Sequence, residues 1–508
     1  MAKRQTDART SAIRGSLPYC IAAAVAAGSP VSAFAHGAAA SADASPLGQF
    51  MAKMASRAPV AARPAAQPAL TTDIVVSSCA DDGGFDTLRH AVLVANPGDT
   101  IDMSSLTCSK ITLQSPGAIS IGLDDLTIVG PGADNLTIDG ADAGRVFFHA
   151  GMGTLTLNNL TVAHGTFAAD KAFGGCIYSK ANITLNSSVV TSCTAHGQSL
   201  SAGGGIIAFG ALILHSSVLA GNTAITDVGA DDALSATGGA AFSVENSRLV
   251  QSIVSGNSAH SAAGKVYGGG IATSGLTAKY STITDNQAAT LPPTLTNFGS
   301  GGGIAMASNS TIFASTIDNN TADASGGLGI SDDGMTTTAI TQSTISSNVG
   351  TLGIGALQAA GKITILNSTI AFNTSGPIVG VNVLFDSTAK VQGSIIADNS
   401  PTDADGGGAI TGTNSLIKII GSNITLPMGT LRVDPNLGPL ANNGGLTRTH
   451  ALNSGSPAIN AGVASPAYPS DQRGTTYPRL AGSATDIGTY EVDTDHIFGT
   501  AFDYVYAF

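Results

Sequence analysis

The chain has 508 residues, of which 63 are glycine and only 11% are charged, and its formal net charge is −12. An ordinary soluble domain carries about 25% charged residues, so the polar surface here is built mainly from Ser, Thr, Asn and Gly. An acidic chain with few cations is a poor partner for nucleic acid, anionic lipid or a polyanionic glycan, which argues against those ligands. A hydrophobic content of 43% argues against a disordered chain.

The first 35 residues have the pattern of a secretory signal. A basic start is followed by an apolar run over 17–27, and Ala33-Phe34-Ala35 offers a cleavage site. The run is too short to span a bilayer, and no later segment has the length of a membrane helix. We therefore expect an exported chain, with an extended Ala/Pro-rich linker over 36–72.

Four cysteines remain beyond this leader, and an even number in an exported chain indicates two disulfides. Pairing by proximity predicts Cys79–Cys108 and Cys176–Cys193, although four cysteines allow three connectivities. Their spacings do not match a zinc site.

One unit recurs along the middle of the chain: a glycine pair or triplet, alternating apolar residues, and a polar turn that contains Asn. The stretch GGGIATSGLTAKYSTITDNQA over 268–288 is one copy, and NSSVVTSCTA is an early copy with Cys193 in the Asn place. The turn asparagines are Asn222, Asn257, Asn286, Asn320, Asn348, Asn373 and Asn399.

Short units without helical periodicity predict a solenoid, and Ile and Val alternating with Ser and Thr predict a parallel β-helix. Each unit forms one coil, and roughly a dozen coils at about 4.8 Å each would make a rod about 55 Å long. We expect each Asn at a corner, where it tolerates left-handed backbone angles and its amide bonds the equivalent Asn one coil away. Glycine allows sharp corners and close backbone approach.

Unit length varies mainly between the Asn turn and the next glycine cluster. The longest insertions, 224–237 and 288–300, are expected to protrude from one face of the rod. Repeat proteins often build a binding surface from such insertions. Tyr267, Tyr280 and Phe298 are the few aromatic residues near them.

The two ends of the chain carry more specific patterns. DDGGFDTLRHAVLVANPGDTIDM (81–103) and LTIVGPGADNLTIDGADAGRVF (126–147) resemble the start of secreted bacterial β-helix proteins with CSLREA-type or polymorphic-outer-membrane-protein-type repeats. DPNLGPLANNGGLTRTHALNSGSPAINAG (434–462) and DQRGTTYPRLAGSATDIGTYE (471–491) are similar to the choice-of-anchor Q domain. The resemblance implies a right-handed parallel β-helix, export to a Gram-negative envelope or beyond it, and frequent surface attachment. It implies no settled activity.

The resemblance also predicts the division of the chain. A short amphipathic helix in 87–96 would close the first coil of a β-helix over 73–433. A C-terminal coil and cap would follow over 434–491, and a tail over 492–508. Buried charges should be paired, so we expect His450, Asp471, Arg473, Asp486 and Glu491 to hold the last coil in place.

Candidate catalytic chemistry is confined to aspartates. Polysaccharide lyases and hydrolases of this architecture need clustered acids with Ca²⁺ and a basic side chain, or paired carboxylates. An enzyme would bring the candidates together with Arg248, Lys265 or Lys279, although none of these bases lies beside them in the sequence. The candidates are Asp227, Asp231, Asp232, Asp332 and Asp333.

Asp403 and Asp405 are a weak Ca²⁺ candidate that lacks the other ligands of a calcium loop. We therefore expect no cofactor, and turn aspartates that solubilise the chain are the simpler interpretation.

Three functions stay open. The first is a monomeric binding or adhesive module, with a polysaccharide or cell-surface glycan as the candidate ligand and no catalysis of its own. The second is a polysaccharide lyase or glycoside hydrolase of the pectin-lyase-like fold. The third is a passive structural rod. Converging carboxylates would favour the enzyme, and scattered ones would favour the module.

Overall fold

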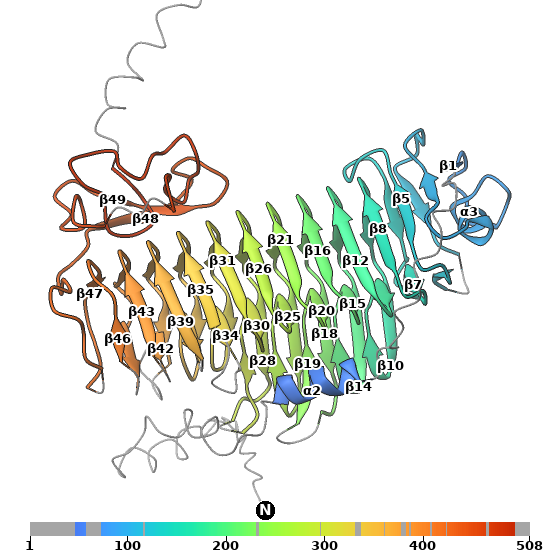
Figure 1. Cartoon of the computed structure of the whole chain (residues 1–508). Helices are drawn as coiled ribbons and strands as arrows, with labels where there is room; N and C mark the ends of the chain where they lie inside the picture. The colour runs from blue at the N-terminus through green and yellow to red at the C-terminus, as the bar shows by residue number, and fades with distance from the viewer. Residues whose placement is uncertain are drawn as a thin grey trace, which may run out of the picture.

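The coils are built from short strands in which buried and more exposed side chains alternate, with Ile, Val and Leu common at the buried positions. The computed structural model describes residues 46–56, 73–114, 117–229, 233–294, 296–330, 337–359, 361–376, 383–385, 388–406, 409–422, 424–463 and 467–492. The predicted signal over 1–35 and the tail after residue 492 lie outside these residues. Within them the chain winds into a parallel β-helix (Figure 1), which confirms the predicted fold.

The coils form four parallel sheets, here named sheets A to D, of which sheet D spans the coils between residues 166 and 375. In the described residues, sheet A has 13 strands, sheet B has 12, and sheets C and D have 11 each. Sheet A comprises β1 (Asp73–Val75), β2 (Thr100–Asp102), β5 (Leu126–Val129), β8 (Thr154–Asn158), β12 (Asn182–Asn186), β16 (Leu212–His215), β21 (Ser247–Val250), β26 (Leu276–Lys279), β31 (Ser310–Phe313), β35 (Thr337–Thr341), β39 (Lys362–Leu366), β43 (Ala389–Gln392) and β46 (Ile410–Thr411).

Sheet B comprises β3 (Lys110–Thr112), β6 (Thr137–Asp139), β9 (Thr161–Ala163), β13 (Val189–Thr191), β17 (Val218–Ala220), β22 (Ile253–Ser255), β27 (Thr282–Thr284), β32 (Thr316–Asp318), β36 (Thr344–Ser346), β40 (Thr369–Ala371), β44 (Ile395–Ala397) and β47 (Leu416–Ile417). Sheet C comprises β4 (Ile119–Ile121), β7 (Phe147–His149), β11 (Ile177–Ser179), β15 (Ile206–Ala208), β20 (Ala241–Ser243), β25 (Ile271–Thr273), β30 (Ile304–Met306), β34 (Leu328–Ile330), β38 (Leu357–Ala359), β42 (Val383–Phe385) and β45 (Ala404–Gly406).

Sheet D carries the strands whose lengths vary most. It comprises β10 (Thr166–Phe173), β14 (Thr194–Ala202), β18 (Thr223–Thr226), β19 (Leu234–Thr237), β23 (Ser258–Ser261), β24 (Lys265–Tyr267), β28 (Gln287–Thr290), β29 (Gly299–Ser300), β33 (Thr321–Ala322), β37 (Val349–Gly350) and β41 (Thr374–Ser375). The predicted insertions belong to this sheet, so the variable segments do gather on one side of the rod.

The core is a column of aliphatic side chains repeated from coil to coil. In sheet B, Val254, Ile283 and Ile317 are register partners on successive strands, and all three are fully buried. Burying one such side chain contributes about 1.5–3 kcal/mol. Because the inward position recurs from strand to strand, the aliphatic column continues from coil to coil.

The predicted asparagine ladder is confirmed. Asn286 donates from its backbone N (3.0 Å) and from Nδ2 (2.9 Å) to Oδ1 of Asn320, and the same double contact joins each consecutive pair from Asn222 to Asn399. At the early end, the backbone N of Cys193 donates to Asn222 Oδ1 at 3.1 Å. Cys193 therefore occupies the ladder position that its place in the repeat predicts.

The expected left-handed conformation of these asparagines is wrong, because it belongs to the residue before each of them. Asp285, Asn319 and Ser347 have φ near +55°, whereas none of the ladder asparagines has a positive φ. The left-handed residue turns the chain through the corner. The Asn that follows can then aim its amide along the rod.

A second ladder, of serines, lies at the corner that precedes sheet B. The backbone N of Ser281 donates to Oγ of Ser315 (3.1 Å), and that of Ser315 donates to Oγ of Ser343 (3.2 Å). Equivalent contacts run from Ser188 to Ser415. The serine stands before every repeat turn in the sequence, but the sequence analysis did not assign it a role.

The glycine triplets meet two separate requirements of the corner between sheets D and C. Gly268 has φ +69°, which favours glycine. At Gly269 a Cβ atom would stand 2.3 Å from the backbone of Gln287 and 2.4 Å from Gly302 O. The first glycine therefore makes the turn, and the second lets neighbouring coils approach.

The N-terminal end of the rod is closed by helix α3 (Leu88–Val94), as predicted. Thr87 caps the helix, with its Oγ1 accepting from the backbone N of His90 at 3.4 Å. Leu88, Ala91 and Val92 are buried against the first coils.

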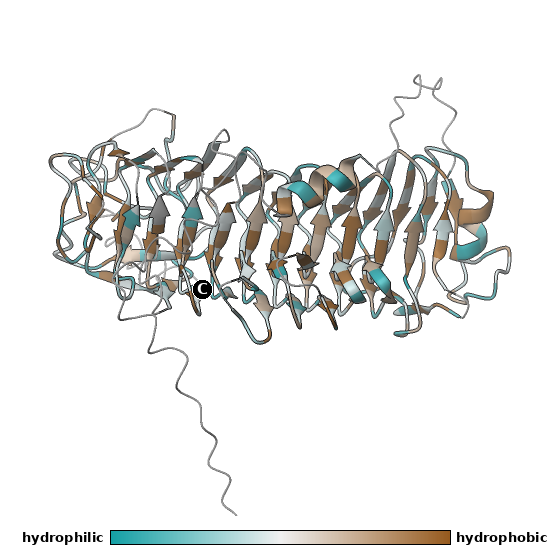
Figure 2. Ribbon diagram, turned by 90° about the horizontal axis from the view of Figure 1, so that it is seen from below, coloured by the Kyte–Doolittle hydropathy of each residue, from teal (hydrophilic) through white to brown (hydrophobic). Residues whose placement is uncertain are grey.

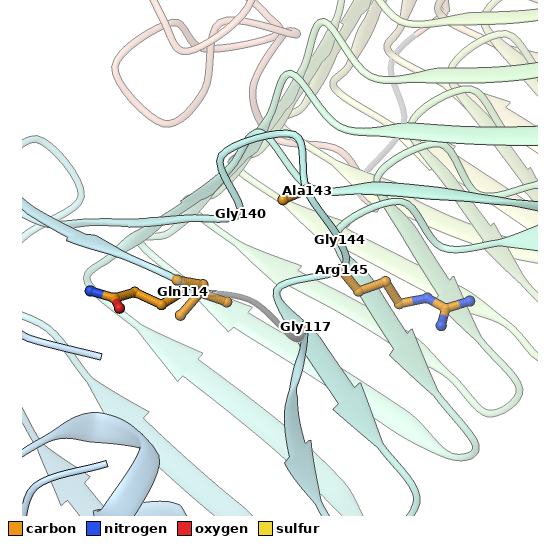
Figure 3. Close-up of a pocket in the computed structure, with 7 residues that line it drawn as sticks. Gln114, Gly117, Gly140, Ala143, Gly144 and Arg145 are labelled. Carbon is orange, nitrogen blue, oxygen red and sulfur yellow. The ribbon is translucent and has the colours of Figure 1, made fainter. Parts of the chain in front are cut away.

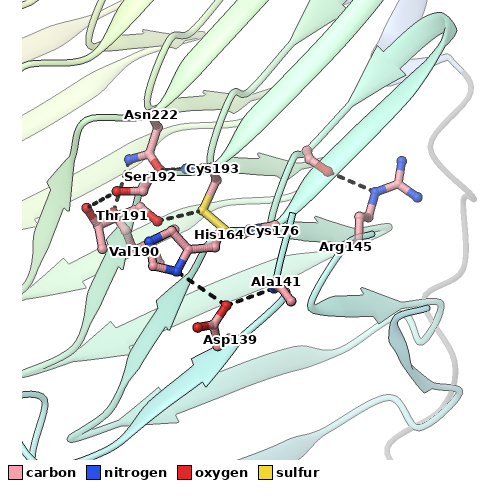
Figure 4. Close-up of a disulfide and its surroundings, with 12 residues drawn as sticks. Asp139, Ala141, Arg145, His164, Cys176, Val190, Thr191, Ser192, Cys193 and Asn222 are labelled. Atoms are coloured by element: carbon pink, nitrogen blue, oxygen red, sulfur yellow. Dashed lines mark hydrogen bonds and ion pairs between the residues drawn. A yellow bond between two sulfur atoms is a disulfide. The ribbon is translucent and has the colours of Figure 1, made fainter. Parts of the chain in front are cut away.

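The two predicted disulfides are both present. Cys79 and Cys108 join the segment before α3 to the loop after β2, with Cα atoms 6.4 Å apart. Cys176 and Cys193 have Cα atoms 5.5 Å apart and lie at the start of the Asn ladder (Figure 4). Disulfides fit an oxidising compartment. No helix among the described residues is long and apolar enough to cross a membrane.

The segment after residue 433 differs from the predicted last coil and cap. Its hairpin, β48 (Leu437–Ala441) and β49 (Thr449–Leu452), is antiparallel, and the segment folds back along the outer face of sheet B (Figure 1). Arg448 O accepts from Thr316 Oγ1 at 2.7 Å, and Gln472 Oε1 accepts from Thr344 Oγ1 at 2.7 Å. This C-terminal segment therefore covers several late coils from the side.

Asp434 pairs with Lys418 of the last coil and Arg448 pairs with Asp318 of sheet B, whereas the buried charges of the segment pair within it. Arg473 donates to Asp471, with Nη2 to Oδ2 at 2.6 Å, and Arg479 Nε lies 3.1 Å from Glu491 Oε1. All four side chains are buried. The pairing fits the expectation that buried charges are compensated. These two ion pairs lie inside the C-terminal segment, and neither includes a residue of the last coil.

The predicted extended linker over 36–72 contains a helix instead. Helix α2 (Pro46–Ala55) lies across successive strands near the junction of sheets C and D, with its axis along the rod (Figures 1 and 2). Leu47, Met51 and Met54 recur on one face of this helix and are buried. The surrounding sequence is rich in Ala and Pro, which favoured an extended linker over a helix, although Leu47, Met51 and Met54 have helical spacing.

Candidate functional site: an aromatic strip on sheet C

The outer face of sheet C carries a column formed by the central residue of each strand. Inward neighbours such as Ile177 and Ser179 are fully buried, so the residue between them points away from the core. Register pairing places these central residues next to one another from coil to coil. From β4 to β30 the column reads Ser120, Phe148, Tyr178, Ile207, Phe242, Ala272 and Ala305.

Aromatic rings stack along the first part of this column. Phe148 and Tyr178 are stacked with ring centroids 5.0 Å apart, and Phe209, just after β15, lies 5.6 Å from Tyr178. Phe148 and Tyr178 are half-buried, so part of each ring is open to solvent. We call Phe148, Tyr178 and Phe209 the aromatic strip.

Arg145 borders the strip. Its guanidinium lies 3.4 Å from the ring centroid of Phe167 and 5.2 Å from that of Tyr178. It also donates from Nε to Gly174 O at 2.8 Å and from Nη2 to Phe173 O at 2.7 Å. These contacts hold the planar group flat beside the rings, a geometry that suits arginine.

Burial shifts the pKa values of Arg145 and Tyr178, the two polar groups at the strip. It lowers the pKa of Arg145 to about 10, which still leaves the guanidinium charged at neutral pH. It raises the pKa of Tyr178, so its phenol stays protonated and can donate a hydrogen bond. The strip therefore offers ring surface, one cation and one hydroxyl.

Two hollows lie close to the strip. The first, of about 10 Å³, is lined by Gln114, Gly117 and Gly144, and the Arg145 side chain extends away from Gln114 (Figure 3). It is too small for a sugar. The second, of about 260 Å³, lies between helix α2 and the long strands of sheet D. Its lining is Phe50, Lys53, Met54, Lys171, Phe173, Ser199, Leu200 and Leu234.

A second group of polar side chains lies under the C-terminal segment. Asp318, at the end of β32, accepts from Arg448 Nη2 at 2.5 Å and from Thr284 Oγ1 at 3.3 Å, while its Oδ1 is buried without a hydrogen-bond partner. Burial raises the pKa of Asp318 to about 6.

One coil further on, Ser346 Oγ lies 2.9 Å from His450 Nε2, and His450 Nδ1 lies 2.8 Å from Gly438 O. Ser346, Asp318 and His450 are all buried beneath the C-terminal segment. This group therefore docks the segment onto sheet B.

Of the aspartates predicted for an enzyme, only Asp227 lies among the described residues. Asp227 is exposed and pairs with His196 on sheet D, with Nε2 to Oδ1 at 2.8 Å. Asp231, Asp232, Asp332 and Asp333 lie outside the described residues. The candidate bases are scattered, with Arg248 and Lys279 on sheet A and Lys265 beside Phe298, 5.9 Å from its ring centroid.

Asp403 has a role that its turn position did not reveal. Its Oδ1 accepts from the backbone N of Asn399 (2.9 Å) and from Asn399 Nδ2 (2.8 Å), and its Oδ2 accepts from the backbone N of Ile419 (2.7 Å). The carboxylate is thus the last acceptor of the Asn ladder. A Ca²⁺ ion at Asp403 and Asp405 would have to displace these contacts. No group of three or more His, Cys, Asp or Glu able to hold a metal occurs among the described residues.

No protein-family model and no curated protein sequence matches the chain. Among solved structures, the chain is similar to pectate lyase Pel9A, with a TM-score of 0.39 and 14% sequence identity. The similarity covers 84% of this chain and 97% of that chain. It concerns the fold alone.

The aromatic strip lies away from the insertions, near which the sequence placed Tyr267, Tyr280 and Phe298. Of these three, Tyr267 is buried beneath α2, Tyr280 pairs with Phe313 at 5.6 Å, and Phe298 lies near Lys265. A signal was present in FFH (147–149) and IYS (177–179), which occupy the same place in consecutive coils. Finding it required the register between those coils.

Proposed function

We propose that this protein is an exported binding module that holds a polysaccharide or cell-surface glycan on the aromatic strip of sheet C. The observation that carries the proposal is the stacked pair of Phe148 and Tyr178, with Phe209 tilted against Tyr178 and Arg145 beside it. Export and attachment to a cell surface belong to the same proposal. They rest on the leader pattern over 1–35, the two disulfides, and the resemblance of 434–491 to the choice-of-anchor Q domain.

The chemistry of the strip suits a neutral sugar chain. A pyranose ring has apolar faces that pack on aromatic rings and hydroxyl groups that need hydrogen-bond partners. The strip supplies ring surface, the Tyr178 hydroxyl and the Arg145 guanidinium. Neighbouring coils are about 4.8 Å apart, so the strip repeats along a straight line, as an extended polymer does. The net charge of −12 makes a polyanion a poorer fit.

The first experiment is affinity electrophoresis through hydroxyethylcellulose, xyloglucan, galactomannan, soluble starch and polygalacturonate. We expect retardation by at least one neutral polymer, and equal mobility in all five gels would refute the proposal. Replacing Tyr178 with Ala should weaken binding to the retained polymer about tenfold, which is about 1.4 kcal/mol.

A matched control separates the strip from aromatic residues in general. Phe313 is another half-buried phenylalanine, on sheet A, and meets Tyr280 edge to face. We expect Phe148→Ala to weaken binding and Phe313→Ala to leave it unchanged. Equal losses from the two variants would place the ligand elsewhere.

The alternative function is a polysaccharide lyase or glycoside hydrolase. The raised pKa of Asp318 favours it, since a carboxyl with a pKa near neutrality can act as a general acid. Against it, the Asp318 side chain is fully buried under the C-terminal segment. Incubation with the same five polymers tests the alternative directly. New reducing ends or unsaturated products that disappear in Asp318→Asn would establish it.

A further inference from the structure

Helix α2 lies on the direct continuation of the aromatic strip. Ile207, Phe242, Ala272 and Ala305 follow Tyr178 in the outer column of sheet C, and all four are buried in one apolar cluster with Leu47, Met51 and Met54 of α2. Tyr178 and Phe173 pack at the edge of the same cluster. The exposed strip and the surface beneath α2 are therefore one apolar face.

Aromatic contacts continue under the helix. Phe50 of α2 meets Phe242 of β20 edge to face, with ring centroids 5.4 Å apart. Phe242 occupies the same column as Phe148 and Tyr178, two coils further on than Tyr178. The α2 ring thus occupies the place on Phe242 that a sugar ring would take if the strip extended that far.

The helix depends on this face for its structure. It has ten residues, and isolated helices of that length are marginal in water. Its buried residues lie on one side, while Gln49, Ala52 and Lys53 are exposed on the other. A helix held in this way can leave the rod without disturbing the coil interior, because the aliphatic core is a separate cluster.

One flank of the helix is open. The hollow of about 260 Å³ separates Phe50, Lys53 and Met54 of α2 from Lys171 and Phe173 of β10 and from strands β14 and β19. A ligand chain that follows the strip from Tyr178 past Phe173 would reach this opening. The contact between α2 and the rod is therefore interrupted on the side where the strip arrives.

We propose that α2 is a displaceable cover over a second half of the glycan strip, and that a long glycan and α2 compete for the face around Phe242. This inference rests on the function proposed above and adds a concealed subsite made of Ile207, Phe242 and Ala272. Because the two occupants exclude each other, glycan binding loosens α2, and loosening α2 strengthens binding of long chains by the same factor.

The test compares two charge variants of the helix. Met51→Asp places a carboxylate against the apolar face and releases α2, whereas Ala52→Asp adds the same charge on the exposed side. The probes are a trisaccharide and an octasaccharide prepared from the polymer that retards the wild-type protein. We expect the octasaccharide to bind Met51→Asp about tenfold more tightly than wild type, a change of about 1.4 kcal/mol. The trisaccharide should bind all three proteins equally, because Phe148 and Tyr178 are open to solvent whether or not α2 is in place.

Hydrogen exchange of the wild-type protein provides a second measurement that needs no variant. Saturation with the octasaccharide should raise amide exchange across 47–55, and the trisaccharide should not. Unchanged protection of 47–55, or equal octasaccharide affinity for the three proteins, would overturn the inference and leave the proposed function intact. A weaker octasaccharide complex in Met51→Asp would make α2 part of the site and would also overturn it. If none of the five polymers binds, both proposals fail together.

Discussion

The asparagine ladder makes a quantitative prediction for Asn320→Ala. Asn320 is fully buried, and its Nδ2 donates to Ile283 O (3.0 Å), Asp318 O (3.0 Å) and Asn348 Oδ1 (2.9 Å). Its Oδ1 accepts from the backbone N and the Nδ2 of Asn286. The variant therefore removes five contacts at one corner.

The magnitude follows from the groups left without partners. The backbone N–H of Asn286 stays buried when its acceptor is removed, and each orphaned buried group costs about 1–3 kcal/mol. With the inner carbonyls also losing their donor, we expect Asn320→Ala to lower the free energy of unfolding by about 3–5 kcal/mol. Ser315→Ala is the matched control in the second ladder, because it orphans only the Ser281 N–H, and we expect a loss of about 1–2 kcal/mol.

Urea denaturation followed by circular dichroism measures both losses under the same conditions. A loss below about 1 kcal/mol for Asn320→Ala, or equal losses for the two variants, would show that neighbouring groups or water replace the ladder contacts. The ladder would then be a consequence of the coil rather than a cause of its stability.

The ladder also predicts how its final position behaves. Asp403 only accepts hydrogen bonds, from Asn399 and Ile419, whereas Asn320 both donates and accepts. Asn320→Asp should therefore be more destabilising than Asp403→Asn, since the first change removes the two N–H donors of a buried amide that serve Ile283 O, Asp318 O and Asn348 Oδ1. The same denaturation assay compares the two, and the opposite order would contradict the assigned direction of the ladder.

Three further predictions concern stability. Burial raises the pKa of Asp318 from 3.8 to about 6, so between these pH values the folded state keeps a proton that the unfolded state releases. The free energy of unfolding should therefore fall by about 3 kcal/mol as the pH rises from about 4 to about 6. Asp318→Asn should flatten that part of the pH profile. Replacing both Cys176 and Cys193 with Ser opens a loop closed at a separation of 17 residues, for which we expect a loss of about 3 kcal/mol, visible as a lower thermal midpoint than that of the wild-type protein when both are measured without reductant. Gly239→Ala should prevent normal folding, because its Cβ would stand 2.1 Å from the backbone of the next coil. Gly256 has nothing within 4 Å of the Cβ position but a φ of +62°, so Gly256→Ala should lower the free energy of unfolding by only about 1 kcal/mol. Equal soluble yields and melting temperatures for the two variants would refute the steric argument.

The repeat was readable from the sequence because coil contacts are regular. Each Asn turn contacts the equivalent turn one coil away. Two asparagines that are one repeat apart in the sequence, such as Asn286 and Asn320, are therefore also neighbours in space. The same regularity made the pairing of Cys176 with Cys193 and the helix after Thr87 predictable. What the sequence did not reveal was which corner residue turns left-handed, because Asn is itself tolerant of that conformation.

Only the tertiary structure decided what lies on the outside of the rod. Phe148 and Tyr178 become neighbours through the register of β7 and β11, and coils of unequal length hide that register in the sequence. The C-terminal segment accepts hydrogen bonds from Thr316 and Thr344, more than a hundred residues earlier, and α2 packs Leu47, Met51 and Met54 into the apolar cluster on sheet C. Stacking of the coils repeats the same contacts in every unit, so it can be recognised as a repeat in the sequence. Each lateral contact forms only once and depends on the surface that the stacked coils expose.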